Sequence, residues 1–279
     1  MSSTDQFIAN VLPNFRLDGK VTVITGGSGG LATVIAQALL LEGSEIALVD
    51  MSEQRTKDAA SALIKWGEIH IKGSEVPKVT AWTCDVSKFT SVEETFTAVN
   101  EAHGKLADRL VHTAGYCENF PAHEYPAANA ERMTQVNLLG SLYVCQAISK
   151  PLIANGIKGC SIVLIGSMSG SIVNNPQPQV VYNMTKAGVI HLARSLATEW
   201  AEYGIRVNTL SPGYILTPLT KNVISGSATM KHEWESRVPM KRLAEPNEFV
   251  GSVLYLLSNT ASSYTTGHNL VADGGYECW

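Results

Sequence analysis

Seven short runs rich in β-branched residues alternate with helix-length amphipathic stretches, and this alternation restricts the fold more than any other feature. In the first stretch, apolar residues recur at positions 31, 34, 35, 38 and 39, the spacing of one helix face packed on a sheet. Strands that are apolar throughout are typical of a parallel sheet covered on both faces. We therefore predict an α/β fold, a doubly wound seven-stranded parallel sheet of the Rossmann type with helices on both faces. The predicted strands are 21–24, 45–49, 79–82, 110–113, 161–165, 206–210 and 269–272, and the other predicted helices lie around 55–66, 92–103, 128–153, 185–203 and 247–257.

The chain of 279 residues contains no repeat, low-complexity tract or linker that would divide it. We expect a single domain over 1–279, which includes an N-terminal extension at 1–17. Two polar loops, 67–78 and 217–237, are longer than most connections in compact domains. The second follows the sixth strand on the side of such sheets where ligands bind, so we predict that it is a mobile cover, or lid, over the substrate.

Composition and charge favour a small-molecule partner. Charged residues make up 16% of the chain and the formal net charge is -4, so no basic field is present to hold nucleic acid or anionic lipid. The sequence has no secretory-signal pattern and no run of about 18 apolar residues, and we expect a cytoplasmic protein with no membrane partner. Its five cysteines show no C-x-x-C spacing and its histidines are scattered, so we expect neither a disulfide framework nor a metal site.

The segment VTVITGGSGGLA, residues 21–32, fits two motifs. It could be a glycine-rich loop that holds a pyrophosphate, or the G-x-S-x-G elbow of an α/β-hydrolase. The elbow requires earlier strands, because its oxyanion hole uses a backbone N–H from a preceding strand–helix loop. Only about twenty residues precede the glycines here, which disfavours the hydrolase.

The phosphate loop further requires a carboxylate at the end of the second strand, to accept hydrogen bonds from an adenosine ribose. Asp50 ends that strand, 24 residues after Gly26. Its charge would repel a 2′-phosphate, and the glycine loop contains no arginine or lysine, so the sequence favours NAD over NADP. A tight turn and a solvated aspartate would explain either feature alone, but together in one strand–helix–strand unit they favour a dinucleotide site.

A second group of residues indicates catalysis. Tyr182 and Lys186 lie four residues apart at the start of a predicted helix, so both face one side. A phenol with a pKa near 10 becomes a useful base only if its pKa falls, and a neighbouring ammonium and an oxidised nicotinamide could both lower it. An exposed pair of residues at i and i+4 with no catalytic role would show the same spacing. Ser167, with Ser169 as a rival, could hold a substrate oxygen at the end of the fifth strand, and Asn137 could hold a water between Lys186 and solvent or simply bond the preceding turn.

In this order the motifs resemble those of the classical short-chain dehydrogenase/reductase family. They are T-G-x-x-x-G at 25–30, Asp50, CDV at 84–86, TAG at 113–115, Asn137, Ser167, Tyr182, Lys186, SPG at 211–213 and the terminal VADGG. The resemblance implies a Ser167–Tyr182–Lys186 catalytic group assisted by Asn137, and a homotetramer. It also implies cofactor contacts at Gly26, Gly30, Leu31, Asp50, Asp85, Val86, Ala114, Gly115, Tyr182, Lys186, Ile215 and Thr217.

Three departures from the family pattern stand out. Ala32 replaces the third loop glycine, and Thr113 replaces the asparagine of the usual N-A-G, which we expect to alter the bonds at that strand end. Ser167 precedes Tyr182 by 15 residues, two more than usual. Alignment on G-S-x-x-G selects Ser167, whereas counting back from the tyrosine selects Ser169, and we prefer Ser167.

The substrate loops are similar to those of polyol dehydrogenases within the family, which implies NAD-dependent oxidation of a pentitol. An NADP-linked ketose reductase or a mannitol- or sorbose-type enzyme is the alternative from the same class, and relative rates with the two cofactors would separate them. A nicotinamide-binding sensor without catalysis is the alternative from another class. Polar residues that could face a polyol are Glu118, Asn119, His123, Asn174, Gln177 and Gln179.

Overall fold

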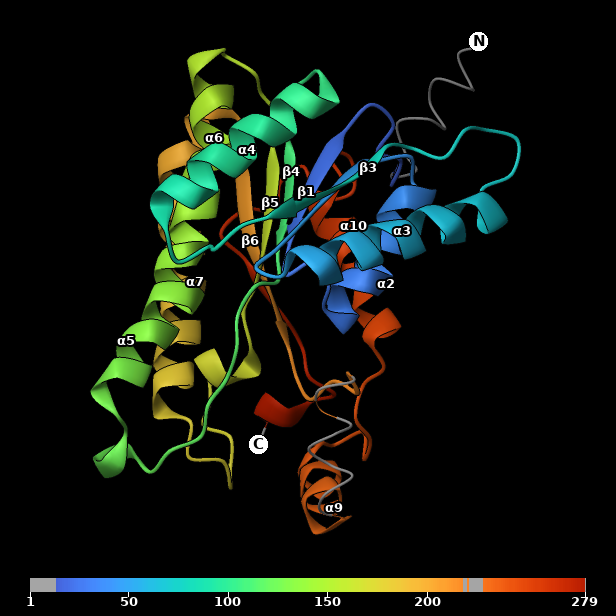
Figure 1. Cartoon of the computed structure of the whole chain (residues 1–279). Coiled ribbons are helices and arrows are strands. Elements are labelled where there is room, and N and C mark those ends of the chain that lie inside the picture. The colour runs from blue at the N-terminus through green and yellow to red at the C-terminus, as the bar shows by residue number, and fades with distance from the viewer. Residues whose placement is uncertain (1–13, 218–219, 221–227, 279) are drawn as a thin grey trace.

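The computed structural model describes residues 14–217, 220 and 228–278. Its strands form one seven-stranded, all-parallel sheet in the order β3-β2-β1-β4-β5-β6-β7 (Figure 1), which confirms the predicted fold class. Between β1 and β4 the order reverses direction along the chain, and ligands bind at such a switch point, beyond the carboxyl ends of the strands. The strands are β1 Val21–Thr25, β2 Glu45–Asp50, β3 Val79–Thr83, β4 Arg109–His112, β5 Ser161–Ile165, β6 Arg206–Pro212 and β7 Asn269–Ala272.

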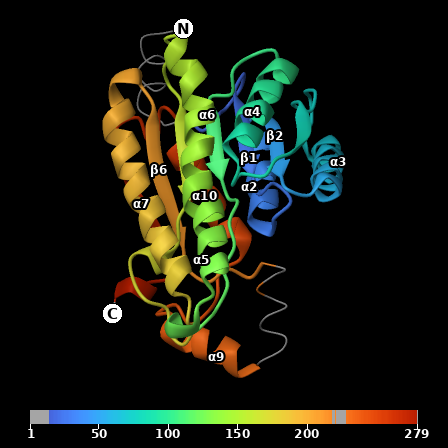
Figure 2. The same ribbon diagram turned by 60° about the vertical axis from the view of Figure 1, so that its left-hand side comes forward.

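Helices cover both faces of the sheet (Figures 1 and 2). On one face lie α4 Phe89–His103, α6 Gly140–Ala154 and α7 Val180–Trp200. On the other lie α2 Gly30–Leu41, α3 Glu53–His70 and α10 Val250–Leu257. Each layer encloses its own hydrophobic core, which explains why the strands are apolar on both sides.

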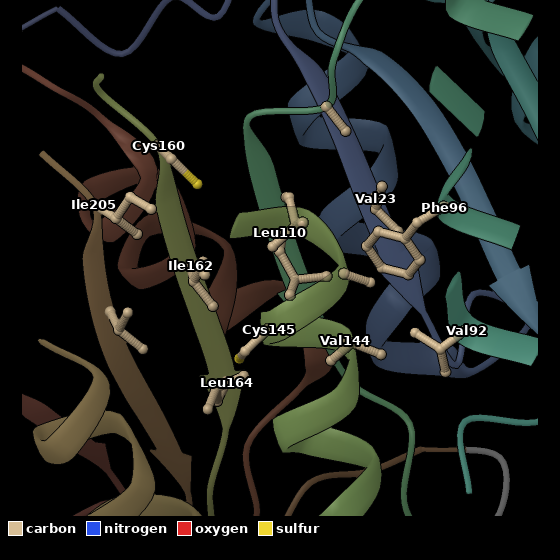
Figure 3. Packing of buried hydrophobic residues seen from close by; sticks show 14 of the residues in the cluster. Val23, Val92, Phe96, Leu110, Val144, Cys145, Cys160, Ile162, Leu164 and Ile205 are labelled. Atoms are coloured by element: carbon tan, nitrogen blue, oxygen red, sulfur yellow. The ribbon is translucent and has the colours of Figure 1, made fainter. Parts of the chain in front are cut away.

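Figure 3 shows the first of these cores. Leu110 of β4 and Ile162 of β5 meet Val144 of α6, while Val23 of β1 packs near Phe96 of α4, and all five are buried. Burying one such side chain stabilises the fold by about 1.5–3 kcal/mol. The core therefore holds the sheet rigid beneath the loops that leave its carboxyl edge.

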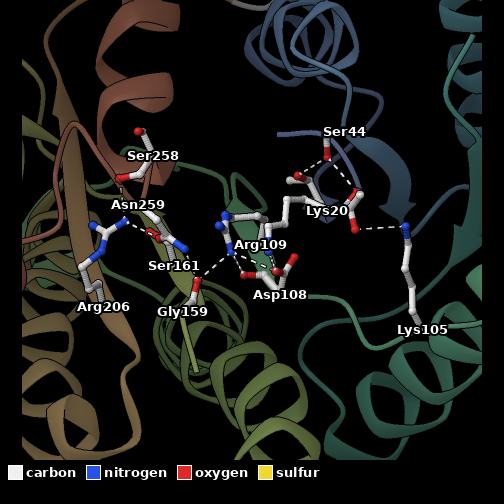
Figure 4. Close-up of polar contacts among 12 residues, drawn as sticks. Lys20, Ser44, Lys105, Asp108, Arg109, Gly159, Ser161, Arg206, Ser258 and Asn259 are labelled. Carbon is white, nitrogen blue, oxygen red and sulfur yellow. Dashed lines mark hydrogen bonds and ion pairs between the residues drawn. The ribbon is translucent and has the colours of Figure 1, made fainter. Parts of the chain in front are cut away.

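The opposite, amino-terminal edge of the sheet is fastened by a buried polar network (Figure 4). The Arg109 guanidinium, 1% exposed, donates 2.8 Å hydrogen bonds to the carbonyls of Asp108 and Gly159 and lies 3.1 Å from the Asp108 carboxylate. Ser161 donates to the carbonyl of Leu256 at 2.8 Å. These bonds tie β4 to the chain that enters β5, and β5 to α10.

The prediction of one continuous helix over 128–153 was wrong. The structure has α5 Ala127–Thr134, a π-helical turn Gln135–Leu139, and then α6. Asn137 lies in this turn, and its amide hydrogen-bonds the main chain of Tyr116 on a neighbouring loop. Such turns commonly occur at functional sites, and this one places Asn137 against the carboxyl edge of the sheet.

The loop boundaries also needed correction. Residues 67–70 are the last turn of α3, where His70 stacks on Trp66 with ring centroids 4.3 Å apart. In the predicted lid, 228–237 form the helix α9 Ala228–Arg237, while 218–219 and 221–227 lie outside the described residues. Of the N-terminal extension, residues 1–13 lie outside them too, and Leu17 is part of the core. Within the described part of the chain, no helix is long and apolar enough to cross a membrane.

Candidate active site

The predicted site residues follow the carboxyl ends of five neighbouring strands. Gly26 comes directly after β1, Asp50 ends β2, Asp85 follows β3, Gly115 follows β4 and Ser167 follows β5. Because all strands are parallel, these ends meet at one edge of the sheet. The seventh strand and the C-terminal turn also reach this edge (Figure 1).

The glycine loop after β1 fits closely against the end of β4. Gly26 has a φ of 66°, and a Cβ there would lie 2.7 Å from Thr113 Oγ1 and 2.9 Å from the backbone nitrogen of Ala114. The N-cap of α2 is Gly29, which has no side chain to cap the helix, so the first N–H groups of α2 can bind an anion. The Thr113 hydroxyl donates to the Thr25 carbonyl at 2.7 Å, which shows how threonine links the two strand ends where the family has asparagine.

The Asp50 carboxylate is held at the end of β2 by several donors. Its Oδ2 accepts from the backbone N–H of Ser28 at 3.1 Å and from the Ser28 hydroxyl at 2.6 Å, and its Oδ1 accepts from the Met51 N–H at 2.8 Å. The Ser28 hydroxyl is therefore bonded to a carboxylate. The serine of a hydrolase elbow would need a histidine in that position. Arg55, in the first turn of α3, lies 3.7 Å from Asp50 Oδ1, a cation that the sequence argument about the glycine loop did not consider.

A cavity of about 370 Å³ opens beside this loop. Six predicted cofactor residues line it, together with Arg55 and residues of the loops after β3 and β4: Gly26, Asp50, Asp85, Val86, Ala114 and Gly115. The other predicted contacts do not line it. Gly30 and Leu31 begin α2, Ile215 pairs with Ala244 after β6, and the Thr217 hydroxyl lies 2.7 Å from that of Thr220.

Tyr182 and Lys186 both lie in the first turns of α7 and face the carboxyl edge of β5. Burial raises the pKa of the Tyr182 phenol to about 12, although its hydrogen bond with Ser167 acts in the opposite direction. Lys186 is 6% exposed, donates to the Ile165 carbonyl at 2.7 Å, and has its Nζ 5.7 Å from the centre of the Tyr182 ring. Burial lowers the pKa of this ammonium to about 8. In the chain alone, desolvation of the phenol thus outweighs the opposing effect of the Ser167 hydrogen bond on its pKa.

The two candidate serines differ in their partners. The Ser167 hydroxyl hydrogen-bonds Tyr182 and accepts from the backbone N–H of Ser169 at 3.1 Å. The Ser169 hydroxyl instead donates to Asn174 and accepts from Gln179 Nε2 at 3.0 Å. The Ser167 hydroxyl, rather than that of Ser169, is therefore the one that lies beside the phenol.

Asn137 is buried, and its amide hydrogen-bonds both the loop after β4 and α7. Oδ1 accepts from the Tyr116 N–H at 3.1 Å, while Nδ2 donates to the Tyr116 carbonyl at 2.9 Å and to Thr185 Oγ1 at 3.3 Å. A Cβ at Gly115 would lie 3.1 Å from Asn137 Oδ1 and 3.7 Å from Lys186 Nζ. The amide therefore positions the loop after β4 beside Lys186.

A buried polar network beside the catalytic group was not predicted as a unit. It joins Ser169, Asn174 and Gln179 to the Tyr214 hydroxyl, which lies 3.2 Å from both Asn174 Nδ2 and Gln177 Nε2. The Tyr214 ring stacks on Trp234 of α9 with centroids 4.4 Å apart.

Of the other polar candidates, Glu118 accepts from Asn129, Asn119 contacts Cys117, and His123 is exposed beside Glu124. Among residues 14–217, 220 and 228–278, no group of three or more His, Cys, Asp or Glu residues could hold a metal.

This arrangement defines a nicotinamide-dependent oxidoreductase. The family model described as enoyl-(acyl carrier protein) reductase matches residues 26–277, and the chain belongs to the short-chain dehydrogenase/reductase family. The family resemblance noted in the sequence is therefore confirmed.

Individual relatives extend the match over the whole chain. A D-arabinitol 2-dehydrogenase (ribulose-forming) of Scheffersomyces stipitis is 65% identical over 99% of this chain and 100% of its own length. An NADH-dependent L-xylulose reductase of Ambrosiozyma monospora is 55% identical over 98% of this chain and 100% of its own. A crystal structure of a short-chain type dehydrogenase/reductase from Mycobacterium marinum superposes with a TM-score of 0.86 at 32% identity, covering 95% of this chain and 98% of that one.

Proposed function

We propose that this chain is an NAD-dependent polyol dehydrogenase that oxidises the C2 alcohol of a pentitol, D-arabinitol, to the ketose D-ribulose. The observation that carries the chemistry is the meeting of Ser167, Tyr182 and Lys186 beside the cavity at the carboxyl edge of the sheet. The 65% identity to a ribulose-forming D-arabinitol dehydrogenase supports the substrate.

In this proposal the substrate alcohol lies between the hydroxyls of Ser167 and Tyr182. Tyr182, as phenolate, removes the proton of the C2 hydroxyl while the C2–H electron pair leaves with its hydrogen as hydride, so that the carbonyl forms. The bound dinucleotide supplies the acceptor for that hydride. Ser167 holds the substrate oxygen throughout, and the ammonium of Lys186 favours the negative charge on the phenol.

The residues present suit a dinucleotide. The close approach at Gly26 and the uncapped start of α2 form a cradle for a pyrophosphate, with Gly30 and Leu31 at the first turn of the helix. Asp50 would accept hydrogen bonds from the adenosine ribose, and its charge would repel a 2′-phosphate. We assign the cavity around Asp85, Val86, Ala114 and Gly115 to the same cofactor, with Lys186, Ile215 and Thr217 toward its nicotinamide half. The NADH-dependent relative supports this preference for NAD.

An NADP-linked ketose reductase is the second candidate, and one observation favours it. Arg55 offers a guanidinium 3.7 Å from Asp50, where a 2′-phosphate would need a cation. We rank it second because the carboxylate of Asp50 already occupies the nearby donors of Ser28. Initial rates with NADH and NADPH on D-ribulose decide between the two candidates, since a preference for NADPH would select the reductase.

We further propose that 1–279 form one domain, that 217–237 cover the substrate, and that the enzyme is a cytoplasmic homotetramer. Light scattering of the purified protein tests the last point.

The direct test of function is an assay of D-arabinitol, xylitol, ribitol, sorbitol and mannitol with NAD, with identification of the products. We expect the highest kcat/KM with D-arabinitol and D-ribulose as its product. D-xylulose as the product, or no oxidation of any of these polyols, would contradict the proposal.

A further inference from the structure

Gln179 stands at the start of α7, three residues before Tyr182, so the two side chains lie on the same side of the helix. It is 7% exposed and does not cap the helix through its side chain. Its amide belongs to the network around Ser169 and Asn174. The hydrogen bonds within this network determine which atom of the amide can still bond a ligand.

The donor end of the amide is fully used. Nε2 carries two hydrogens and lies 2.9 Å from Asn183 Oδ1, 3.0 Å from Ser169 Oγ and 3.2 Å from Asn174 Oδ1. Three acceptors thus compete for two hydrogens. This fixes the orientation of the amide, because a rotated amide would place an oxygen against the oxygens of Asn174 and Asn183.

The acceptor end is almost unused. Within the described part of the chain, Oε1 has one hydrogen-bond partner, the Cys117 thiol, at 3.7 Å, and a thiol is a weak donor. A carbonyl oxygen has two lone pairs, so Oε1 can accept a stronger bond. Ser169, which Gln179 contacts, lies in the turn whose first residue, Ser167, hydrogen-bonds Tyr182, so the Gln179 amide lies beside the catalytic group.

We propose that Gln179 is a specificity-determining residue, whose Oε1 accepts a hydrogen bond from a substrate hydroxyl on a carbon next to the one oxidised. This rests on the proposed polyol oxidation. A hydroxyl can donate to an amide oxygen, whereas a hydrogen or a carbonyl at that carbon cannot. The residue would therefore select polyols over simple secondary alcohols.

The test compares D-arabinitol with its 1-deoxy and 3-deoxy analogues, which each lack one hydroxyl next to C2. For the unmodified enzyme we expect one analogue to have a kcat/KM about tenfold lower than D-arabinitol. If that analogue does not turn over, we expect it to bind about tenfold more weakly, as a correspondingly higher Ki. Gln179→Met keeps the volume and removes the acceptor, so it should lower kcat/KM for D-arabinitol about tenfold and make that analogue equal to D-arabinitol.

Gln146→Met, on the exposed side of α6, is the matched control and should leave all three constants unchanged. Equal losses on all three substrates in Gln179→Met, or no loss, would overturn the inference. A lack of D-arabinitol oxidation in the unmodified enzyme would instead refute the proposed function. Thermal melting of each variant separates these outcomes from misfolding.

Discussion

The backbone N–H of Ser169 donates a 3.1 Å hydrogen bond to the hydroxyl oxygen of Ser167. This bond fixes the turn after β5, with Ser167 at its start and its hydroxyl beside the Tyr182 phenol. The Ser169 side chain turns to Asn174 and Gln179 instead. The two serines, both candidates in the sequence with Ser167 preferred, thus have different partners.

The difference in partners predicts different effects of removing each hydroxyl. Ser167→Ala removes the group that holds the substrate oxygen, and we expect kcat to fall about 10²–10³-fold, the range for loss of one such donor. Ser169→Ala weakens only the support of Gln179, so kcat should fall less than about tenfold. Steady-state kinetics with D-arabinitol and NAD measure both. A larger loss in Ser169→Ala would reverse the assignment.

The pKa values predict a direction for the pH dependence. Oxidation requires the deprotonated Tyr182, and burial raises the pKa of this phenol in the chain alone. The phenolate fraction, and with it kcat/KM for polyol oxidation, should therefore rise as the pH increases above 7, until Lys186, with a pKa of about 8, loses the ammonium that favours the phenolate. Ketose reduction needs the protonated phenol and should not rise over the same range. Oxidation that is fastest below pH 7 would contradict the role of Tyr182.

The contacts of Asp50 predict the cofactor preference of a variant. Asp50→Ala removes the acceptor for the ribose hydroxyls and the charge that repels a 2′-phosphate, while it releases Ser28 and Arg55 from the carboxylate. The ratio of kcat/KM for NAD to that for NADP should fall at least about tenfold, since hydrogen bonds to charged groups contribute about 1.5–3 kcal/mol. Asp58→Ala, which removes an exposed carboxylate bonded to Gln54, is the matched control and should keep the ratio. An unchanged ratio in Asp50→Ala would remove Asp50 from the cofactor site.

The sheet was predictable because its signal is local. Five of the β-branched runs are buried over most of their length and the edge strands β3 and β7 are half-buried, and all seven strands lie within two residues of their predicted ends. The interruption of the helix at Asn137 was not predictable, because it accompanies a bond to Tyr116, 21 residues earlier in the chain. Only the folded structure brings those residues together.

The site shows the same difference between local and long-range signals. Gly26, Asp50 and Ser167 follow strand ends, so their meeting follows from a parallel sheet. Gln179 contacts Cys117, 62 residues earlier in the chain, and the stack of Tyr214 on Trp234 joins the segment after β6 to α9. The approach of Arg55 to Asp50 could not be predicted from the sequence, because it depends on where α3 begins.

The central claim is that Tyr182 is the base for polyol oxidation. Its most direct test is the kcat/KM of Tyr182→Phe with D-arabinitol and NAD, beside a titration of NADH binding. We predict a loss of at least about a hundredfold in kcat/KM with NADH binding retained, because the phenyl ring keeps the packing but cannot take the proton. Oxidation at the rate of the unmodified enzyme would contradict the account and would favour a nicotinamide-binding protein whose chemistry lies elsewhere.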